Sequence, residues 1–372
     1  MSSLDGSRIV DAVLAHGLDA VVCASPENVA YAAGFVVPSQ SLMRWRHAAV
    51  VVTAAGDEAM VCVDMEESTV RAARPDAELR TWAEFTGDAM ATLATLLTDL
   101  GLERGRIGVE LSYLAAADFA RLQAALPGAI FCAADSLLTQ ARQIKSATEI
   151  ELLARLSRIS DTAIGDALRS VRAGDTEMDI AAALTRSVYE QGATSFKLMI
   201  VATGPRSQLP NVGPSDRRLI AGDVCRVEIF SVIDGYHAGV CRTAVVGPSP
   251  RGADEVYRRL VDCRDLVMEL VRPGMPAREI YARYRTRLEE LNLPAISFVG
   301  HGIGVNLHEQ PYLGPHSDTL LEPGMVLGVE PLVYRTEYGF GMQIKDMVRV
   351  TADGVELLSD VNSTDQPIAV PA

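Results

Sequence analysis

Two histidines and one glutamate in the carboxyl-terminal part of the chain carry the clearest chemical signal in the sequence. His301 lies within the glycine-rich run 300–304, and His308 follows a few residues later. The apolar run 325–329 then leads directly to Glu330. Imidazole and carboxylate groups transfer protons, and neighbouring strands can present them to a single cavity. The pattern therefore predicts part of an active site.

The elements that precede this motif indicate an α/β domain over residues 1–143. Short apolar runs such as 18–24 alternate with helical patterns such as 89–100, and this alternation is typical of α/β folds. Ser146 with Glu149 three residues later is a capping box that starts a long helix. We place the domain boundary before that helix, between residues 143 and 144.

Residues 144–372 are expected to form an α+β domain, a curved antiparallel sheet backed by helices. The pair Asp234-Gly235 marks a tight turn between two long strands. The sequence predicts helices near 177–190, 253–271 and 276–291, and strands within 197–203, 223–246 and 325–350. The motif histidines and Glu330 therefore belong to the second domain.

The composition is typical of a soluble cytoplasmic protein that binds neither nucleic acid nor a membrane. Forty-eight acidic and thirty-four basic side chains give a net charge of -14, which repels polyanions at long range. No apolar run approaches the ~18 residues of a membrane span, and the amino terminus lacks the apolar stretch of a signal peptide. The six cysteines form no C-x-x-C pair, so we expect reduced thiols.

The chain resembles the creatinase, prolidase and methionine aminopeptidase family over essentially its whole length. This resemblance implies the pita-bread fold for residues 144–372, after an amino-terminal α/β domain. Besides the motifs of His301, His308 and Glu330, it is carried by Gly222-Asp223, Asp234-Gly235-Tyr236-His237, Arg242-Thr243, Pro323-Gly324-Met325, Gly339-Phe340-Gly341 and Lys345-Asp346.

The resemblance also locates a metal site in the family's metal-dependent members, which hold two divalent ions with two Asp, one His and two Glu side chains. The matching positions in this chain are Glu228, Gly239, His301, Glu330 and Lys345. Glycine offers no carboxylate, and a charged lysine has three donors and no lone pair. We therefore predict no two-metal site, no metal ligand and no cofactor.

A charge count predicts the kind of ligand. Glu228, Glu330 and Lys345 sum to a charge of about -1, whereas the family's four carboxylates and two divalent ions sum to zero. Because unpaired buried charge is costly, either one carboxylate is protonated or the ligand supplies a cation. The resemblance to the creatine-cleaving branch of the family implies a cationic ligand. It therefore also implies metal-independent hydrolysis of a C–N bond in a small compound with a cationic nitrogen group and a carboxylate.

In this interpretation each residue of the motif has a catalytic role. Glu228 and Glu330 would bind the nitrogen group of the substrate. His301 and His308 would transfer protons, and Lys345 would balance charge or polarise a carbonyl.

Other residues are expected to contact the substrate. Asn211 stands where family members carry a histidine, and Cys241 stands where creatinase has a carboxylate, so creatine itself is a poor candidate. Arg46 matches a position that reaches the neighbouring subunit's site in creatinase-like dimers, which implies a homodimer. The substrate-binding candidates are Arg46, Asn211, Tyr236, His237, Cys241 and Tyr312.

Three other functions are compatible with these residues. The first is a prolidase-type metallopeptidase in which Glu228, His301 and Glu330 hold a single ion. The second is a pita-bread binding protein without catalysis. The third is a lyase or cyclase acting on a biosynthetic intermediate, because asparagine at position 211 cannot serve as a base.

Overall fold

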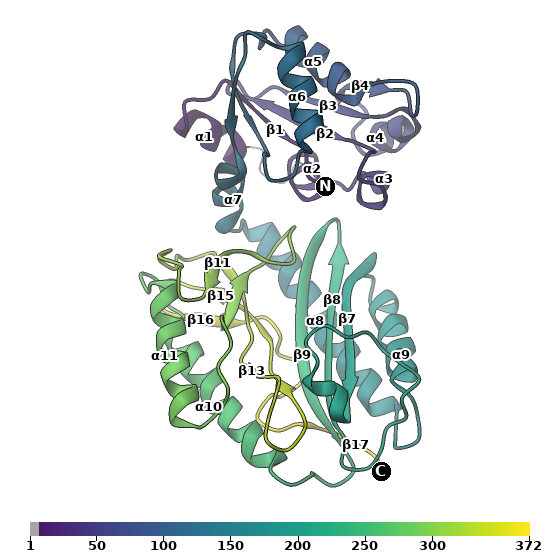
Figure 1. Cartoon of the computed structure of the whole chain (residues 1–372), viewed down its shortest axis with the longest axis vertical. Coiled ribbons are helices and arrows are strands. Elements are labelled where there is room, and N and C mark those ends of the chain that lie inside the picture. Colours follow the sequence, from purple (N-terminus) through teal and green to yellow (C-terminus); the bar gives the residue numbers. More distant parts are fainter. Residues whose placement is uncertain (1–6) are drawn as a thin grey trace. The chain divides into compact units, whose positions relative to one another are not determined.

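The computed structural model describes residues 7–372, and the chain divides into two compact units, one up to Arg142 and one from Gln143 onward (Figure 1). Within the described residues, no helix is both long enough and apolar enough to cross a lipid bilayer. The predicted architecture, an α/β domain followed by a pita-bread domain, is confirmed.

The first unit is a six-stranded mixed sheet packed against helices, with strand order β4-β3-β2-β1-β5-β6. Every residue of its inner strands β1 and β2 is buried, which explains their continuous apolar sequence. Its elements are α1 (Ser7–Ala15), β1 (Ala20–Cys23), α2 (Pro26–Ala33), α3 (Pro38–Leu42), β2 (Ala49–Thr53), β3 (Glu58–Val63), η1 (Asp64–Glu66), α4 (Glu67–Ala73), β4 (Glu78–Trp82), α5 (Ala89–Asp99), β5 (Arg106–Val109), α6 (Ala116–Ala125), β6 (Ile130–Ala133) and α7 (Asp135–Gln143).

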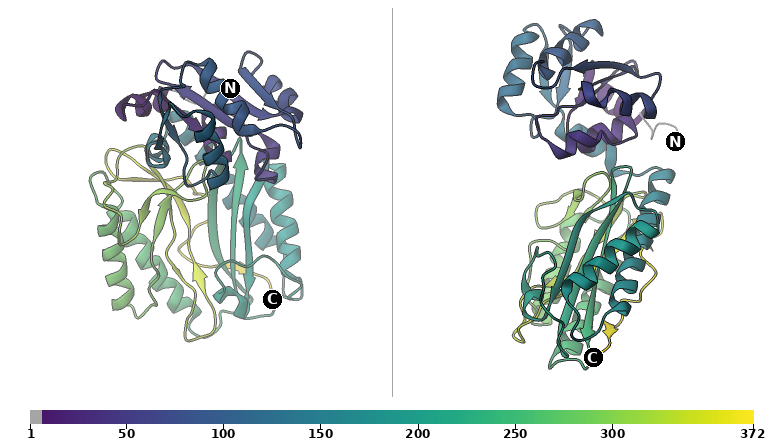
Figure 2. Two further views of the ribbon diagram at one scale, coloured as in Figure 1. Left: turned by 45° about the horizontal axis from the view of Figure 1, so that its top comes forward. Right: turned by 90° about the vertical axis from the view of Figure 1, so that its right-hand side faces the viewer.

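The second unit begins with two helices that cover a four-stranded sheet. The capping box at Ser146 and Glu149 starts the first of them, as predicted. Both views in Figure 2 place the two helices on one face of β7, β8 and β9. The elements are α8 (Ala147–Ser170), α9 (Glu177–Glu190), β7 (Ser195–Thr203), η2 (Gly204–Gln208), β8 (Val224–Ile233), β9 (Tyr236–Val246) and β17 (Ile368–Val370).

The remainder of the unit repeats this plan with a five-stranded sheet, order β11-β10-β12-β15-β16, and two further helices. Apolar side chains of the helices and of β11, β12 and β15 form one core cluster. The elements are α10 (Ala253–Leu270), α11 (Ala277–Glu290), β10 (Gly300–Gly302), β11 (Glu309–Leu313), β12 (Val326–Val329), β13 (Leu332–Val333), β14 (Met342–Gln343), β15 (Asp346–Val350) and β16 (Val355–Leu357).

A buried guanidinium fixes the junction between the two sheets. Arg242 of β9 pairs with Asp161 of α8 and with Asp346 of β15, each at 3.0 Å. It also donates to the backbone carbonyls of Cys241 at 3.1 Å and Lys345 at 2.8 Å. Burial would lower the pKa of Arg242, but the two carboxylates outweigh it and raise the pKa. The hydrogen bond from Arg242 therefore fixes the backbone of Lys345.

We predict that Arg242→Met lowers the free energy of unfolding by about 3–5 kcal/mol, because it leaves Asp161 and Asp346 buried without their cation. Urea denaturation followed by circular dichroism measures the change. The matched control is Arg258→Met, since Arg258 is exposed on α10. Equal effects of the two substitutions would contradict the role given to Arg242.

Candidate functional site

The antiparallel pair β8–β9 forms the floor of the site. Alternate residues of a strand face the same side, so Arg226, Glu228 and Phe230 share one face of β8. Glu228 stands opposite Cys241, and Phe230 stands opposite Gly239. All of these positions are buried. The hairpin thus brings a guanidinium, a carboxylate and an aromatic ring to one interior surface.

Three further side chains come from the second sheet. His301 of β10 lies opposite Gly328 of β12, and Glu330 follows the end of that strand. Lys345 precedes β15 and forms a backbone bridge with Cys241. A Cβ atom at Gly328 would lie 3.0 Å from Lys345 Cε and 3.5 Å from the His301 ring. The glycine therefore leaves the space in which the lysine and the histidine meet.

The ammonium of Lys345 is the centre of this cluster. Its Nζ lies 3.3 Å from Glu228 Oε1, 3.2 Å from Glu330 Oε2 and 3.1 Å from His301 Nε2. It also lies 4.4 Å from the ring centroid of Phe230, a cation–π distance. Lys345 is 0% exposed, so it is not a surface lysine, and its part in a reaction stays a prediction.

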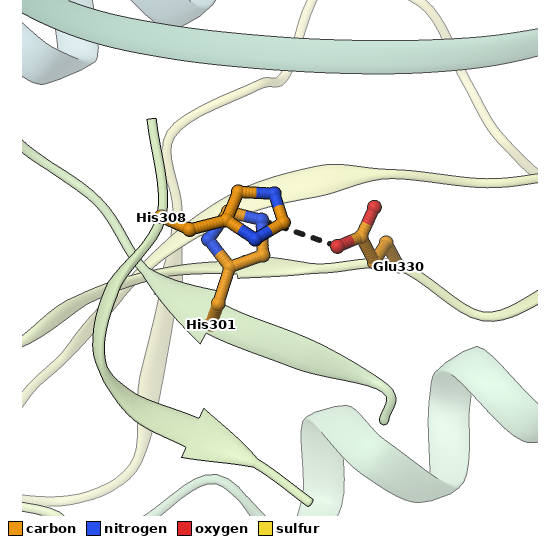
Figure 3. Close-up of side chains that lie close together, drawn as sticks. All are labelled: His301, His308 and Glu330. Atoms are coloured by element: carbon orange, nitrogen blue, oxygen red, sulfur yellow. Dashed lines mark ion pairs between the residues drawn. The ribbon is translucent and has the colours of Figure 1, made fainter. Parts of the chain in front are cut away.

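The two histidines lie one above the other beside Glu330 (Figure 3). Their ring centroids are 3.7 Å apart and their planes differ by 18°. His301 Nδ1 lies 2.7 Å from the Gly302 carbonyl, so this nitrogen carries a proton and donates it. Its Nε2 lies 3.1 Å from Lys345 Nζ. Glu330 Oε1 lies 3.1 Å from the same nitrogen.

Burial and charge shift the pKa values of the cluster in different directions. Burial raises the pKa of Glu228, and Lys345 offsets this only in part. At Glu330 burial is outweighed by Lys345 and by the hydrogen bond with His301, and the pKa falls to about 2. Burial would lower the pKa of Lys345, but Glu330 and Glu228 raise it. Partial burial of its ring, with the charges of His301 and Lys345, lowers the pKa of His308 to about 4. We therefore treat Lys345 as charged and His308 as neutral at pH 7.

Arg226 is a second buried cation, which the sequence interpretation missed. It is 1% exposed, and its Nη1 donates to Gln343 Oε1 at 2.9 Å. The Gln343 amide in turn donates to Glu330 Oε2 at 3.2 Å and lies 3.4 Å from Glu228 Oε2. The sequence signal that could have identified this cation is an arginine two residues before Glu228 in a mostly apolar strand. With Arg226 and Lys345, two cations balance two carboxylates, so the expected charge deficit does not exist.

Three of the predicted substrate-binding residues are buried and have contacts within the protein. The Tyr236 hydroxyl donates to Glu149 at 2.9 Å. His237 lies against the Gly304 carbonyl, and burial lowers its pKa to about 4. Cys241 is fully buried and burial raises the pKa of its thiol. Tyr236 and Cys241 serve the fold in this arrangement.

Of the other three predicted residues, two belong to the second unit and one to the first. Asn211 is exposed in the loop after η2. Arg46 belongs to the first unit and pairs with Glu84 at 2.7 Å, and its role in a partner's site, like the homodimer, stays a prediction. Tyr312 is half-exposed, with its ring centroid 6.2 Å from that of His308.

Comparison with known proteins assigns the class and then the family. The model for the creatinase/prolidase N-terminal domain matches residues 7–144. Together with the second unit, this match defines a two-domain protein of the pita-bread type. The model for metallopeptidase family M24 matches residues 151–352. The chain therefore belongs to metallopeptidase family M24.

Relatives and solved structures of this family match the chain over different lengths. The uncharacterized peptidase YqhT of Bacillus subtilis is 29% identical over 91% of this chain and 92% of its own length. The Xaa-Pro dipeptidase of Pyrococcus furiosus is 30% identical over 60% of this chain and 65% of its own. The structure of a Xaa-Pro dipeptidase from Bacillus anthracis superposes with a TM-score of 0.84 at 25% identity, covering 98% of this chain and 99% of that one.

The residues of this chain do not fit a two-metal centre of the family's kind. A Cβ atom at Gly239 would lie 2.3 Å from the Phe230 ring, so an aspartate there would collide with an aromatic side chain. The Lys345 ammonium touches both glutamates at the position of the last metal ligand. A charged lysine cannot coordinate a cation and repels it.

Among residues 7–372, one group of side chains has donors close enough to hold a single ion. Ligand atoms of His301, His308 and Glu330 all lie within 4.8 Å of one another. The lone pair of an imidazole nitrogen lies in the ring plane, however, and two stacked, nearly parallel rings confine their lone pairs to separate planes instead of directing them toward one point. An ion at this place would require the rings to turn and Lys345 to withdraw.

The predicted metal-independent hydrolysis of a small cationic compound is wrong. The relatives reported above with a described activity are Xaa-Pro dipeptidases, not creatine-cleaving enzymes. The physical reason for expecting a cationic ligand also fails, because Arg226 supplies the positive charge that the count lacked.

We predict that Lys345→Met lowers the free energy of unfolding at pH 7 by about 3–5 kcal/mol, because Glu228 and Glu330 lose their buried partner. Chemical denaturation measures this change. Lys197→Met is the matched control, since Lys197 is exposed on β7. A Lys345→Met protein as stable as the control would contradict a charged lysine at this place.

The same variant has an expected pH dependence. The pKa of Glu330 lies below its ordinary value of 4.5, at about 2. Its ionised form therefore stabilises the fold above pH 4.5, and this contribution is lost as the pH falls toward 2. The difference between wild type and Lys345→Met should shrink over that interval. A difference independent of pH would argue against the ion pair.

Proposed function

We propose that this protein binds short peptides of the Xaa-Pro class in its second unit and does not hydrolyse them by a two-metal route. The observation that carries this proposal is the Lys345 ammonium in contact with Glu228, Glu330 and His301. It fills the place of a metal ligand with a cation, while the fold and the histidines of the family remain.

The proposed class of ligand is taken from the relatives. The low solvent exposure of the charged cluster supports binding of a peptide without its hydrolysis. The relatives reported above with a described activity carry the name Xaa-Pro dipeptidase. Glu228, Glu330, Lys345 and His301 are at most 4% exposed, so a peptide bond has little access to them. His308 is exposed, and its neutral ring can donate to and accept from a peptide amide. We therefore assign the first contact with the ligand to His308.

Hydrolysis of Xaa-Pro peptides is the second candidate. It is favoured by the proximity of His301, His308 and Glu330, whose ligand atoms lie within 4.8 Å of one another. This candidate requires Lys345 to leave its ion pairs, so it predicts stoichiometric metal in the active protein and a preference for conditions that neutralise the lysine.

We predict that Xaa-Pro dipeptides stabilise the protein without being cleaved. At a peptide concentration 100 times the dissociation constant, the free energy of unfolding should rise by about 2.7 kcal/mol. Thermal denaturation measures the gain, and mass spectrometry of the same samples measures cleavage. Both are repeated with added Mn²⁺, Co²⁺ or Zn²⁺ and after dialysis against a chelator.

Two variants connect the result to the site. His308→Ala should weaken binding, whereas His16→Ala in the first unit should not, because His16 is exposed and bonds only its own helix at Ala12. Cleavage that requires a bound metal would establish the second candidate instead. The absence of both stabilisation and cleavage would refute the peptide as the ligand.

A further inference from the structure

A cavity beside His308 has the size and lining of a ligand site. Its volume is about 680 Å³, within the range of about 300–1,000 Å³ that is usual for small-molecule sites. It is lined by the end of the loop before β10 and by residues 308–319, all in the second unit. His308 belongs both to this cavity and to the stacked pair with His301, so the cavity opens directly beside the charged cluster.

Three rings surround the cavity. The centroid of His308 lies 6.4 Å from that of Phe298 and 6.2 Å from that of Tyr312. The rings are tilted by 55° and 59°, so their faces and edges point in different directions. A further aromatic ring can make edge-to-face or offset contacts with such a surface at ring separations of about 4.5–7 Å.

The residues that line the cavity carry little charge. One of them has a hydroxyl group without a hydrogen-bond partner among the described residues. Asp318 lines the cavity but pairs with Arg278, and the low pKa of His308 keeps that ring neutral. Ser317 also lines the cavity, and among the described residues its buried Oγ has no hydrogen-bond partner. Buried hydroxyl groups are normally paired, so a polar ligand atom beside Ser317 would satisfy it.

We propose that this cavity binds an aromatic side chain that carries a hydrogen-bonding group, such as the phenol of tyrosine or the indole of tryptophan. This inference rests on the proposed function, in which the residue before proline supplies the ring. The three rings hold the aromatic face, Ser317 pairs with the hydroxyl or the indole N–H, and the paired Asp318 leaves the cavity without net charge. The cavity thereby selects among Xaa-Pro peptides by the identity of Xaa.

Isothermal titration calorimetry with Tyr-Pro, Phe-Pro and Ala-Pro tests this selection. Tyr-Pro should bind about fivefold more tightly than Phe-Pro, as expected for one additional hydrogen bond. Ser317→Ala should remove this preference. Phe298→Ala and Tyr312→Ala should weaken Tyr-Pro about tenfold and change Ala-Pro less than twofold. Tyr189→Ala is the matched control, because Tyr189 is exposed on α9. Circular dichroism verifies that each variant is folded.

N-acetyl-tyrosinamide separates the cavity from the proposed peptide function, because it keeps the ring and lacks the proline. Its binding, weakened by Phe298→Ala, supports the cavity even where no Xaa-Pro dipeptide binds, and that result would refute the proposed function alone. Dipeptides that bind with equal affinity whatever their Xaa would refute the cavity and leave the proposed function standing. If neither probe binds, the cavity inference is overturned as well.

Discussion

The second unit depends on one buried contact, the Lys345 ammonium between Glu228 and Glu330. These side chains come from segments far apart in the sequence, and their charges are tolerable inside the protein only when they are paired. The backbone of Lys345 is bridged to Cys241 and accepts a hydrogen bond from Arg242. The contact therefore links the two sheets of the unit, and its geometry is set by the fold and not by a bound ligand.

Arg226 completes the balance of charge around this contact. Gln343 connects its guanidinium to both glutamates, so the cluster contains two cations and two anions. Because the charges cancel and the groups are almost fully buried, the cluster has no electrostatic need for a ligand. The proposed ligand therefore meets the more exposed side of the site, where His308 and Tyr312 border the cavity.

The sequence contains more information about the fold than about the function. Periodicity and the capping box at Ser146 predict the start of the long helix α8, and the turn at Asp234-Gly235 predicts the β8–β9 hairpin, because these signals are local. Departures at Gly239 and Lys345 are equally visible in the sequence. The charge count failed because it included only positions that match known ligands, and Arg226 is not one of them. Its positive charge enters the count only in the folded structure, where strand alternation puts Arg226 on the same face as Glu228 and Gln343 connects it to both glutamates.

The departures from the family's metal ligands form a coupled set. Phe230 occupies the space above Gly239, so an aspartate at position 239 alone would meet the ring and also add a third carboxylate to a balanced cluster. A glutamate at position 345 alone would leave three carboxylates with Arg226 as the remaining cation. Each single reversion is unfavourable in the presence of the others, because it breaks either the packing or the charge balance. A two-metal centre at this place would thus require concerted changes at Phe230, Gly239 and Lys345, because the lysine-centred arrangement is balanced in both packing and charge.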